Sequence, residues 1–316
     1  MKILSWILLA AVIAVYCPAA AWASEAEWKE LTAKSDAEYR AGKLPEAEAN
    51  AKKALEVAEK TFGKEDLRVG ESANNLARIY LATGRLDLAE GLLNRAIAIN
   101  EKAGGPDHHS LVAPLNNLAM AYHSQEKIAE AEALYKRILA IDAKKPLADR
   151  IPIAETLDNL AILYGNQGNF AEAEKLVKAA IELLEKATGP DNPRLTSSLN
   201  NLASLYGDQQ RFDEAIPLQQ KAVAILEKSL GPESLDVAVF VQNLAGLQVS
   251  AWKPAEAEAL LNRVLAILTK RFGPDHETVM DTLLNLSDVY KAMGSNAKAE
   301  EAEKKAAEIQ AKLGQK

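Results

Sequence analysis

The sequence of 316 residues contains little of what several classes of protein require. Its single cysteine, Cys17, excludes an internal disulfide network and a cysteine-ligated metal site. Aromatic residues make up only 5% of the chain, whereas large β-sandwiches and barrels usually contain many aromatic and β-branched side chains. We therefore expect a core of alanine and leucine side chains on helices.

An excess of positive charge is also missing, because acidic residues outnumber basic ones and the net charge is −7. Proteins that bind nucleic acids need clustered lysine and arginine to displace counterions from phosphates. No nucleic-acid partner is therefore expected. Glutamate and lysine are interspersed along the chain, which is typical of solvated helix faces.

Motifs for catalysis and for cofactors are absent from the sequence as well. It has no phosphate-binding loop, no dinucleotide fingerprint and no nucleophile elbow. The histidines do not have the spacing of metal ligands; they are His108, His109, His123 and His276. We therefore predict a protein that is not an enzyme and that binds neither a cofactor nor a metal ion.

Residues 1–23 differ from the rest of the chain. A basic residue precedes an apolar run over residues 3–16, and residues 21–23 place alanine at the two positions that a signal peptidase recognises. We predict a signal peptide that is cleaved before Ser24, export to the periplasm or the medium, and no stable membrane insertion afterwards. The alternatives are an uncleaved membrane anchor and a lipoprotein modified at Cys17.

One segment recurs every 42 residues without an insertion or a deletion. It reads Asn-Asn-Leu-Ala at residues 74–77, 116–119 and 200–203, and variants occur at residues 158–161, 242–245 and 284–287. A column of alanines with the same period has no exception; its members are Ala47, Ala89, Ala131, Ala173, Ala215, Ala257 and Ala299. Self-similarity at a fixed period predicts an array of equal repeats.

Each 42-residue repeat is predicted to form two helices. In residues 67–108, apolar side chains such as Leu76 have helical spacing, and Gly84 ends this first helix. A second helix is expected over residues 86–102, followed by Gly104 as a left-handed C-cap. The alanine column lets the two helices of a repeat approach closely, because larger side chains would force them apart.

These columns resemble the tetratricopeptide repeat. The motif residues in the second repeat are Leu76, Ala77, Tyr80, Gly84, Leu86, Ala89, Leu93 and Ala96. The period and the linker Gly105-Pro106-Asp107-His108 resemble the longer variant found in kinesin light chains and many bacterial proteins. The resemblance implies an all-α, right-handed α-solenoid of about seven helix-turn-helix repeats, in a single array over residues 24–316. The repeats are expected at about residues 25–66, 67–108, 109–150, 151–192, 193–234, 235–276 and 277–316, the last with a capping helix.

In this family the first helix of each repeat lines a concave groove that binds an extended peptide. The resemblance places a stripe of asparagines in that groove: Asn75, Asn117, Asn159, Asn201, Asn243 and Asn285. A carboxamide can pair with both the C=O and the N–H of a peptide. The alternative is that these asparagines connect adjacent helices to one another.

Neighbouring positions give the expected groove its character. Arg78 is the single basic residue among them, Asn116 and Asn200 are neutral, and the acidic residues are Glu71, Glu155, Asp158, Asp208, Asp281 and Asp288. An acidic groove favours a basic or neutral peptide by complementarity. We therefore predict an exported scaffold that binds a protein or peptide partner. The alternative is a structural module that docks folded partners, or another copy of itself, through its convex face or terminal edges.

Aromatic residues are expected mostly in the core. A column of tyrosines follows the repeat and should be buried; it comprises Tyr80, Tyr122, Tyr164, Tyr206 and Tyr290. Trp252 occupies a turn where other repeats have glycine, and we expect it to pack beneath the next repeat, with partner anchoring as the alternative. A cap at the start of the array is expected to involve Trp28 and Leu31.

Overall fold

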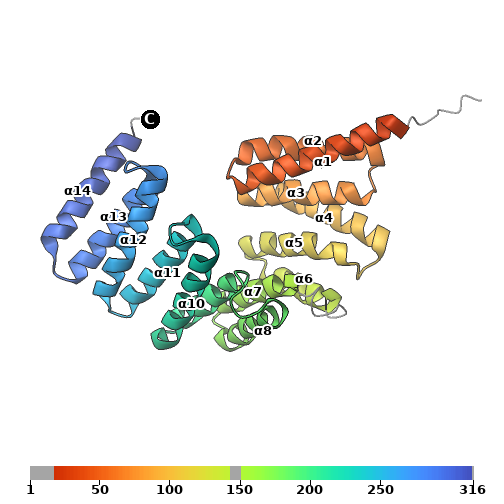
Figure 1. The fold of residues 1–316 in the computed structure, drawn as a ribbon. Coiled ribbons are helices and arrows are strands. Elements are labelled where there is room, and N and C mark those ends of the chain that lie inside the picture. Colours follow the sequence, from red (N-terminus) through yellow and green to blue (C-terminus); the bar gives the residue numbers. More distant parts are fainter. Residues whose placement is uncertain (1–17, 143–150, 315–316) are drawn as a thin grey trace, which may run out of the picture. The chain divides into compact units, whose positions relative to one another are not determined.

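The structure is a computed structural model that describes residues 18–142 and 151–314. Secondary structure in these ranges is entirely helical, which confirms the all-α class, and neighbouring helices run antiparallel (Figure 1). In chain order the helices are α1 (Pro18–Arg40), α2 (Leu44–Phe62), α3 (Leu67–Ala82), α4 (Leu86–Gly104), the short 3-10 helix η1 (His109–Leu111), α5 (Val112–Ser124), α6 (Ile128–Asp142), α7 (Ile151–Asn166), α8 (Phe170–Thr188), α9 (Leu195–Asp208), α10 (Phe212–Leu230), α11 (Leu235–Ser250), α12 (Pro254–Phe272), α13 (Glu277–Ala292) and α14 (Asn296–Leu313).

The chain divides into two compact units between Leu134 and Tyr135. The N-terminal unit contains α1 to α5 and the beginning of α6, and the C-terminal unit contains the end of α6 and α7 to α14. Each unit has buried apolar clusters of its own. One in the N-terminal unit includes Trp28 and Val69, and one in the C-terminal unit includes Val241 and Val264.

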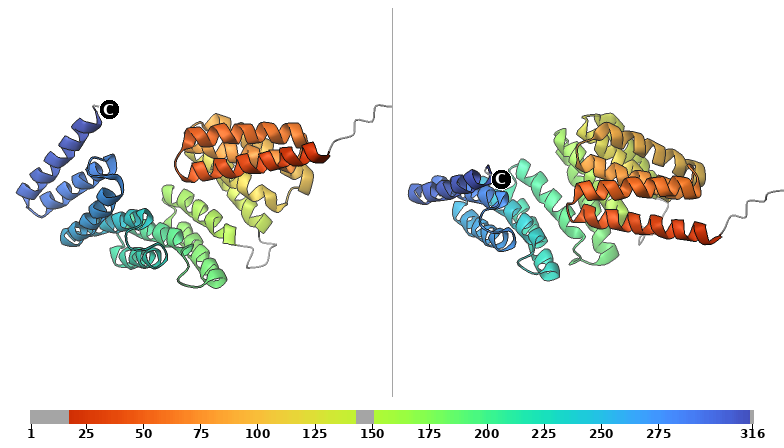
Figure 2. Two further views of the ribbon diagram at one scale, coloured as in Figure 1. Left: turned by 45° about the horizontal axis from the view of Figure 1, so that its top comes forward. Right: turned by 90° about the horizontal axis from the view of Figure 1, so that it is seen from above.

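Helices pack in pairs, and each pair packs on the next. In the C-terminal unit, α7 contacts α8, α8 contacts α9, and this order continues to α14. First helices of consecutive repeats also contact one another, as α7 does with α9 and α9 with α11 (Figure 2). First helices therefore lie side by side over α1, α3 and α5 in the N-terminal unit and over α7, α9 and α11 in the C-terminal unit.

The alanine column lies at the centre of the helix pairs, as predicted. Its exposed fraction is 0% at every member from Ala47 to Ala257 and 2% at Ala299. The tyrosine column is buried in part: Tyr80 and Tyr206 are 6% and 3% exposed, and the other three are half-buried. A larger side chain in the alanine column would have to displace the facing helix.

The turn between the two helices of a repeat requires a left-handed residue. Gly84 there has a φ of 72°. Where glycine is absent, Glu126, Gln210 and Trp252 adopt φ values of 60°, 59° and 58°, and they are the non-glycine residues with positive φ in the described ranges. The fold therefore imposes this conformation on side chains that disfavour it.

Two expectations about turns were wrong. Trp252 does not pack beneath the next repeat, because its side chain is 89% exposed. Gly104 is not the left-handed cap; it is the last residue of α4, and Gly105 has the positive φ, 85°. Glycine is needed at position 104 for another reason, since a Cβ there would lie 2.2 Å from the imidazole of His108.

Both ends of the described array are covered. Trp28 on α1 is 6% exposed, packs edge-on against Phe62, and donates its indole N–H to the Ser72 hydroxyl at 2.8 Å. At the other end, α14 buries small or aliphatic side chains such as Ala302 and Ile309 and exposes its charged residues. Both terminal helices thus shield apolar surface from water.

Ion pairs connect successive repeats at a separation of 37 residues. Arg85 pairs with Glu48, and Arg211 pairs with Glu174 at 2.7 Å. Hydrogen bonding from Lys178, and then from Arg211, lowers the pKa of Glu174 to about 2. The guanidinium of Arg211 also lies 3.9 Å from the ring centre of Tyr206. Charged side chains were expected only to cover solvated helix faces. Some of them therefore also join neighbouring repeats.

The predicted signal peptide lies largely outside the described residues, which begin at Pro18. The predicted cleavage position, before Ser24, falls within α1. Over residues 18–142 and 151–314, no helix combines the length and the apolar character needed to span a bilayer.

Candidate peptide-binding groove

Three hollows follow the first helices of the C-terminal unit. The first, of about 450 Å³, lies between the N-terminal parts of α7 and α9 and is lined by Asp158, Asn159 and Asn201, among others. The second, of about 270 Å³, lies further along the same helices and includes Asn201 and Asp208. The third, of about 620 Å³, reaches from α9 over α11 to α13. Shared lining residues, Asn201 and then Asn200, connect the three into one groove.

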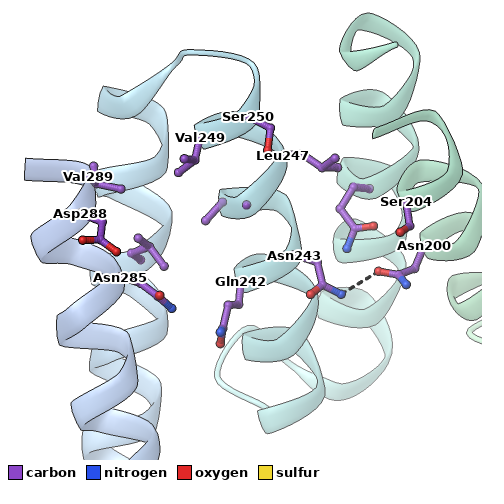
Figure 3. A pocket seen from close by; sticks show the side chains of 14 residues that line it. Asn200, Ser204, Gln242, Asn243, Leu247, Val249, Ser250, Asn285, Asp288 and Val289 are labelled. Atoms are coloured by element: carbon purple, nitrogen blue, oxygen red, sulfur yellow. Dashed lines mark hydrogen bonds between the residues drawn. The ribbon is translucent and has the colours of Figure 1, made fainter. Parts of the chain in front are cut away.

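The third hollow is open because its floor has small side chains. Ser204 and Gly246 lie on the facing surfaces of α9 and α11, and a Cβ added at Gly246 would meet no atom within 4 Å. Val249 adds an apolar wall and is 45% exposed. Asn285 and Asp288 project from α13 on the opposite side (Figure 3). The hollow can therefore accommodate an apolar side chain between polar edges.

The predicted groove residues that line these hollows are Asn159, Asn200, Asn201, Asn243, Asn285, Glu155, Asp158, Asp208 and Asp288. Asp281 on α13 does not line them, and the others belong to the N-terminal unit. Asn75 and Arg78 line a small hollow in which Arg78 is paired with Asp36 at 2.6 Å. Asn116 and Asn117 lie on α5.

Some of the asparagines connect neighbouring first helices. The Asn117 amide donates to Asn74 at 2.8 Å, and the Asn243 amide donates to Asn200 at 2.8 Å (Figure 3). We call each such pair, 43 residues apart, a rung. The rungs fit the alternative in which asparagines hold adjacent helices together. Each rung uses one N–H of one asparagine and the amide oxygen of the other. Because a carboxamide has two N–H donors and an oxygen acceptor, both side chains keep further groups that can bind a peptide.

The rung between α7 and α9 differs because Asp158 replaces the accepting asparagine, opposite Asn201. Asp158 is 6% exposed, and the Ser198 hydroxyl donates to its Oδ2 at 2.6 Å. Its Oδ1 has no hydrogen-bond partner among the described residues. Burial raises the pKa of Asp158 from 3.8 to about 6, although the side chains of Ser198 and Asn201 favour the charged form.

The histidines have structural roles that the sequence did not reveal. The Nδ1 atoms of His108 and His276 accept the backbone N–H groups of Ser110 and Thr278 at 3.3 Å, and so cap η1 and α13. Within the described residues, no three His, Cys, Asp or Glu side chains are grouped so that they could hold a metal ion.

Some lining residues were missed, and a signal for them exists in the sequence. Ser204 and Gly246 occupy the same repeat column as the predicted Arg78 and Asp288, and the identity of this column changes at every step, although the columns of Leu76, Ala77 and Tyr80 are nearly constant. A variable column between constant ones indicates a surface position whose side chain is not fixed by packing.

The family profile described as tetratricopeptide repeat matches residues 31–102, 71–144, 152–228, 196–270 and 241–312. These matches cover most of the chain, and the chain belongs to the tetratricopeptide repeat family. No curated protein matches the sequence significantly.

Solved structures share the fold. BtubC (BKLC) from P. vanneervenii is 24% identical with a TM-score of 0.65, and the match covers 72% of this chain and 92% of that one. The apo form of RapI is 19% identical with a TM-score of 0.61, covering 92% and 100%. The Rap conjugation gene regulator of the plasmid pLS20, in complex with the Phr* peptide, is 13% identical with a TM-score of 0.63, covering 98% and 80%. At these identities the likeness concerns the fold alone.

Proposed function

We propose that the protein is an exported, non-enzymatic scaffold that binds an extended segment of a partner along the groove of its C-terminal unit. The observation that supports this most is the continuity of the three hollows over α7, α9, α11 and α13, with carboxamides contributed by successive repeats. Each hydrogen bond to a peptide contributes only about 0.5–1.5 kcal/mol net, so several must act together. A solved structure with a similar fold is a complex with a peptide, which agrees with this use of the fold.

The preferred segment is neutral or basic, with an apolar side chain for the third hollow. Val249 supplies the apolar wall of that hollow, and Asp288, whose side chain is 80% exposed, supplies a negative charge at its edge. Binding of a basic segment should weaken as salt is added, because exposed charges are screened. Affinity that is independent of salt would contradict this preference.

Filling the third hollow tests the groove directly. Gly246→Leu places a side chain where a Cβ meets nothing within 4 Å, so the fold is retained and the hollow is closed. Gly91→Leu is the matched control, because Gly91 on the second helix α4 also has open space around its Cβ position. Leucine has a higher helix propensity than glycine, so both variants should be more stable by up to about 1 kcal/mol.

The experiment is selection of dodecapeptides from a random library displayed on phage, followed by isothermal titration with the selected peptides. We expect peptides that bind the wild type and the Gly91→Leu variant equally and that bind the Gly246→Leu variant at least about tenfold more weakly, since the filled hollow removes the contacts. Equal binding to the Gly246→Leu variant would show that the groove is not the peptide site.

Docking of a folded partner is the second candidate function, and Trp252 favours it. This side chain is 89% exposed and lies on a left-handed turn at the edge of the array. Exposed tryptophans are enriched among residues that contribute most to binding interfaces. A Trp252→Gly variant that loses a co-purified partner, while the Gly246→Leu variant retains it, would support this second function over the first.

Export follows from the predicted leader and is tested separately. Cleavage before Ser24 predicts that the protein recovered from the periplasm or the medium begins at Ser24. Intact mass measurement of protein from each cell fraction distinguishes this product from the full chain. A protein that retains Met1 and fractionates with membranes would support the anchor instead.

A further inference from the structure

We propose that the turn between α11 and α12 binds an acidic side chain of a partner protein, with Lys253 pairing with its carboxylate and Trp252 packing against an apolar neighbour of that residue. This turn joins the two helices in the C-terminal unit (Figure 1) and does not line the groove. The proposal gives a chemistry to docking at Trp252, the second candidate function, and is independent of the peptide groove.

Junctions between repeats hold a carboxylate at one fixed position of the second helix. Glutamate occupies it in every repeat except one, where the residue is Ile216. In four junctions a basic side chain of the next repeat pairs with this glutamate: Arg85 with Glu48 at 2.5 Å, Lys127 with Glu90 at 3.4 Å, Arg211 with Glu174 at 2.7 Å, and Lys298 with Glu258 at 2.9 Å. The same four bases lie within 5.0 Å of the centre of a tyrosine ring. The repeat therefore forms a binding position for a carboxylate next to a base and a ring.

The junction at Ile216 has the base without the carboxylate. Lys253 occupies the repeat column of Arg211, and Gln248 replaces the tyrosine there. Lys253 is exposed, and among the described residues its ammonium group has no ion pair and no aromatic ring, not even with Glu256 in the next helical turn. A cation whose equivalents are all paired within the array is thus available to a carboxylate from outside the chain.

A carboxylate from another molecule can reach this position. In the equivalent junctions the side chains of Glu48, Glu174 and Glu258 are 18%, 22% and 21% exposed, so their carboxylates lie at the surface of the array. Hydrogen bonds from Arg85, and then from Lys52, lower the pKa of Glu48 to about 2, which shows that such a position favours the charged form. A partner can therefore supply the missing group without separating any helices.

The residue before Lys253 adds an apolar contact. Trp252 is 89% exposed and adopts a φ of 58° on a turn where most repeats have glycine. Consecutive Cα atoms are only about 3.8 Å apart, so a segment that reaches the ammonium group also meets the indole. Tryptophan is enriched among the residues that contribute most to binding. The surface therefore fits a segment in which aspartate or glutamate neighbours an apolar residue.

The test uses two blocked tetrapeptides, acetyl-Leu-Glu-Leu-Glu amide and its neutral match acetyl-Leu-Gln-Leu-Gln amide. Each is titrated into isotope-labelled protein, and the indole N–H signal of Trp252 is followed; the Trp252→Gly variant assigns this signal by removing it. Lys253→Gln is the informative variant. Lys43→Gln is the matched control, because Lys43 is an exposed lysine in the same repeat column that follows Gly42 in place of a tryptophan.

We expect the acidic peptide to shift the Trp252 signal saturably in the wild type and in the Lys43→Gln variant. Binding to the Lys253→Gln variant should be about fivefold weaker, the effect of one exposed ion pair, and the neutral peptide should be weaker on the wild type by the same factor. Ile216→Glu should also weaken binding, because it supplies the missing carboxylate from within the chain. The lysine variant and the neutral peptide decide the matter even if Ile216→Glu perturbs the fold.

Several results would overturn the proposal: equal binding by the Lys253→Gln variant or by a folded Ile216→Glu variant, equal affinity of the two peptides, or no saturable shift in the wild type. A Trp252 signal that shifts when the protein alone is diluted would identify a second copy as the occupant and would also overturn it.

The outcome is separable from that of the groove. Gly246→Leu should leave binding of the acidic peptide unchanged, because Gly246 lines the third hollow; a loss there would place the acidic peptide in the groove and reject the turn. If Trp252→Gly loses a co-purified partner that Lys253→Gln retains, the second candidate function stands and the pairing with a carboxylate is rejected.

Discussion

Asp158→Asn should make the protein more stable at neutral pH. In the folded protein, burial raises the pKa of this carboxyl from 3.8 to about 6. A difference of about two units corresponds to about 3 kcal/mol, by which ionisation of Asp158 disfavours the folded state. The amide removes this cost, and Asn74 shows that the position accepts one, since it receives the Asn117 hydrogen bond in the equivalent rung.

The sign of the pH dependence follows from the same shift. Below pH 3.8 the carboxyl is protonated in both states and has no effect on the free energy of unfolding. As the pH rises from 3.8 to about 6, the unfolded chain loses the proton first, so the folded wild type is progressively destabilised. The advantage of the amide should therefore reach about 3 kcal/mol near pH 7.5 and fall to about half of that near pH 5.

The assay is urea denaturation of both proteins at the two pH values, followed by circular dichroism. Asp191→Asn is the control, because it removes the same charge from an exposed position in the same unit, where Asp191 pairs with Lys228 at 2.9 Å; this lysine lowers the pKa of Asp191, which stays ionised at both pH values. A carbon-13 titration of the wild type should show the Asp158 carboxyl changing near pH 6. A midpoint below pH 4.5, or an Asp158→Asn variant that is less stable than the wild type at pH 7.5, would refute the reasoning.

Three further changes test the packing of the repeats. Ala173→Leu inserts a large side chain at a 0% exposed position and should lower the free energy of unfolding by about 1–3 kcal/mol; an unchanged melting temperature would contradict the packing. Trp252→Gly relieves a φ of 58° and should raise stability by about 1 kcal/mol in urea denaturation; a loss of stability would mean that the indole has contacts of its own. Arg211→Ala removes the inter-repeat ion pair with Glu174 and should lower the free energy of unfolding slightly in low salt and less in high salt; a free energy of unfolding that does not change in low salt would mean that the pair does not stabilise the fold.

Features that depend on a single repeat were predictable from the sequence. The period fixes the helix pairs, and Ala173 could be placed in the core because every repeat has alanine there. The left-handed turn at Trp252 was also implied by the glycines in the same column, although the direction of the indole was not. Side-chain direction depends on the contacts available around the turn, which the column does not encode.

Features that depend on two repeats were not predictable in the same way. The rungs join residues 43 positions apart, and the ion pairs join residues 37 positions apart. Neither separation equals the period, because the contacts cross from one helix position to another in the neighbouring repeat. The burial of Asp158 has the same origin: the sequence placed it in an exposed stripe, but α9 covers it through Ser198. The exposed fraction of a polar side chain depends on how the helix of the next repeat packs over it, and the residue types at one position of the repeat do not reveal that packing.

The asparagine rungs and the ion pairs between repeats join residues 43 and 37 positions apart, and this regularity bears on how the number of repeats can change. If one full period, residues 201–242, were removed, Asn243 would take the place of Asn201 opposite Asp158, and Lys253 would take the place of Arg211 beside Glu174. Lys270 would likewise replace Lys228 beside Asp191. Each donor would again face an acceptor at the new junction. The array can therefore lose or gain whole repeats, and the length of the groove would change with them.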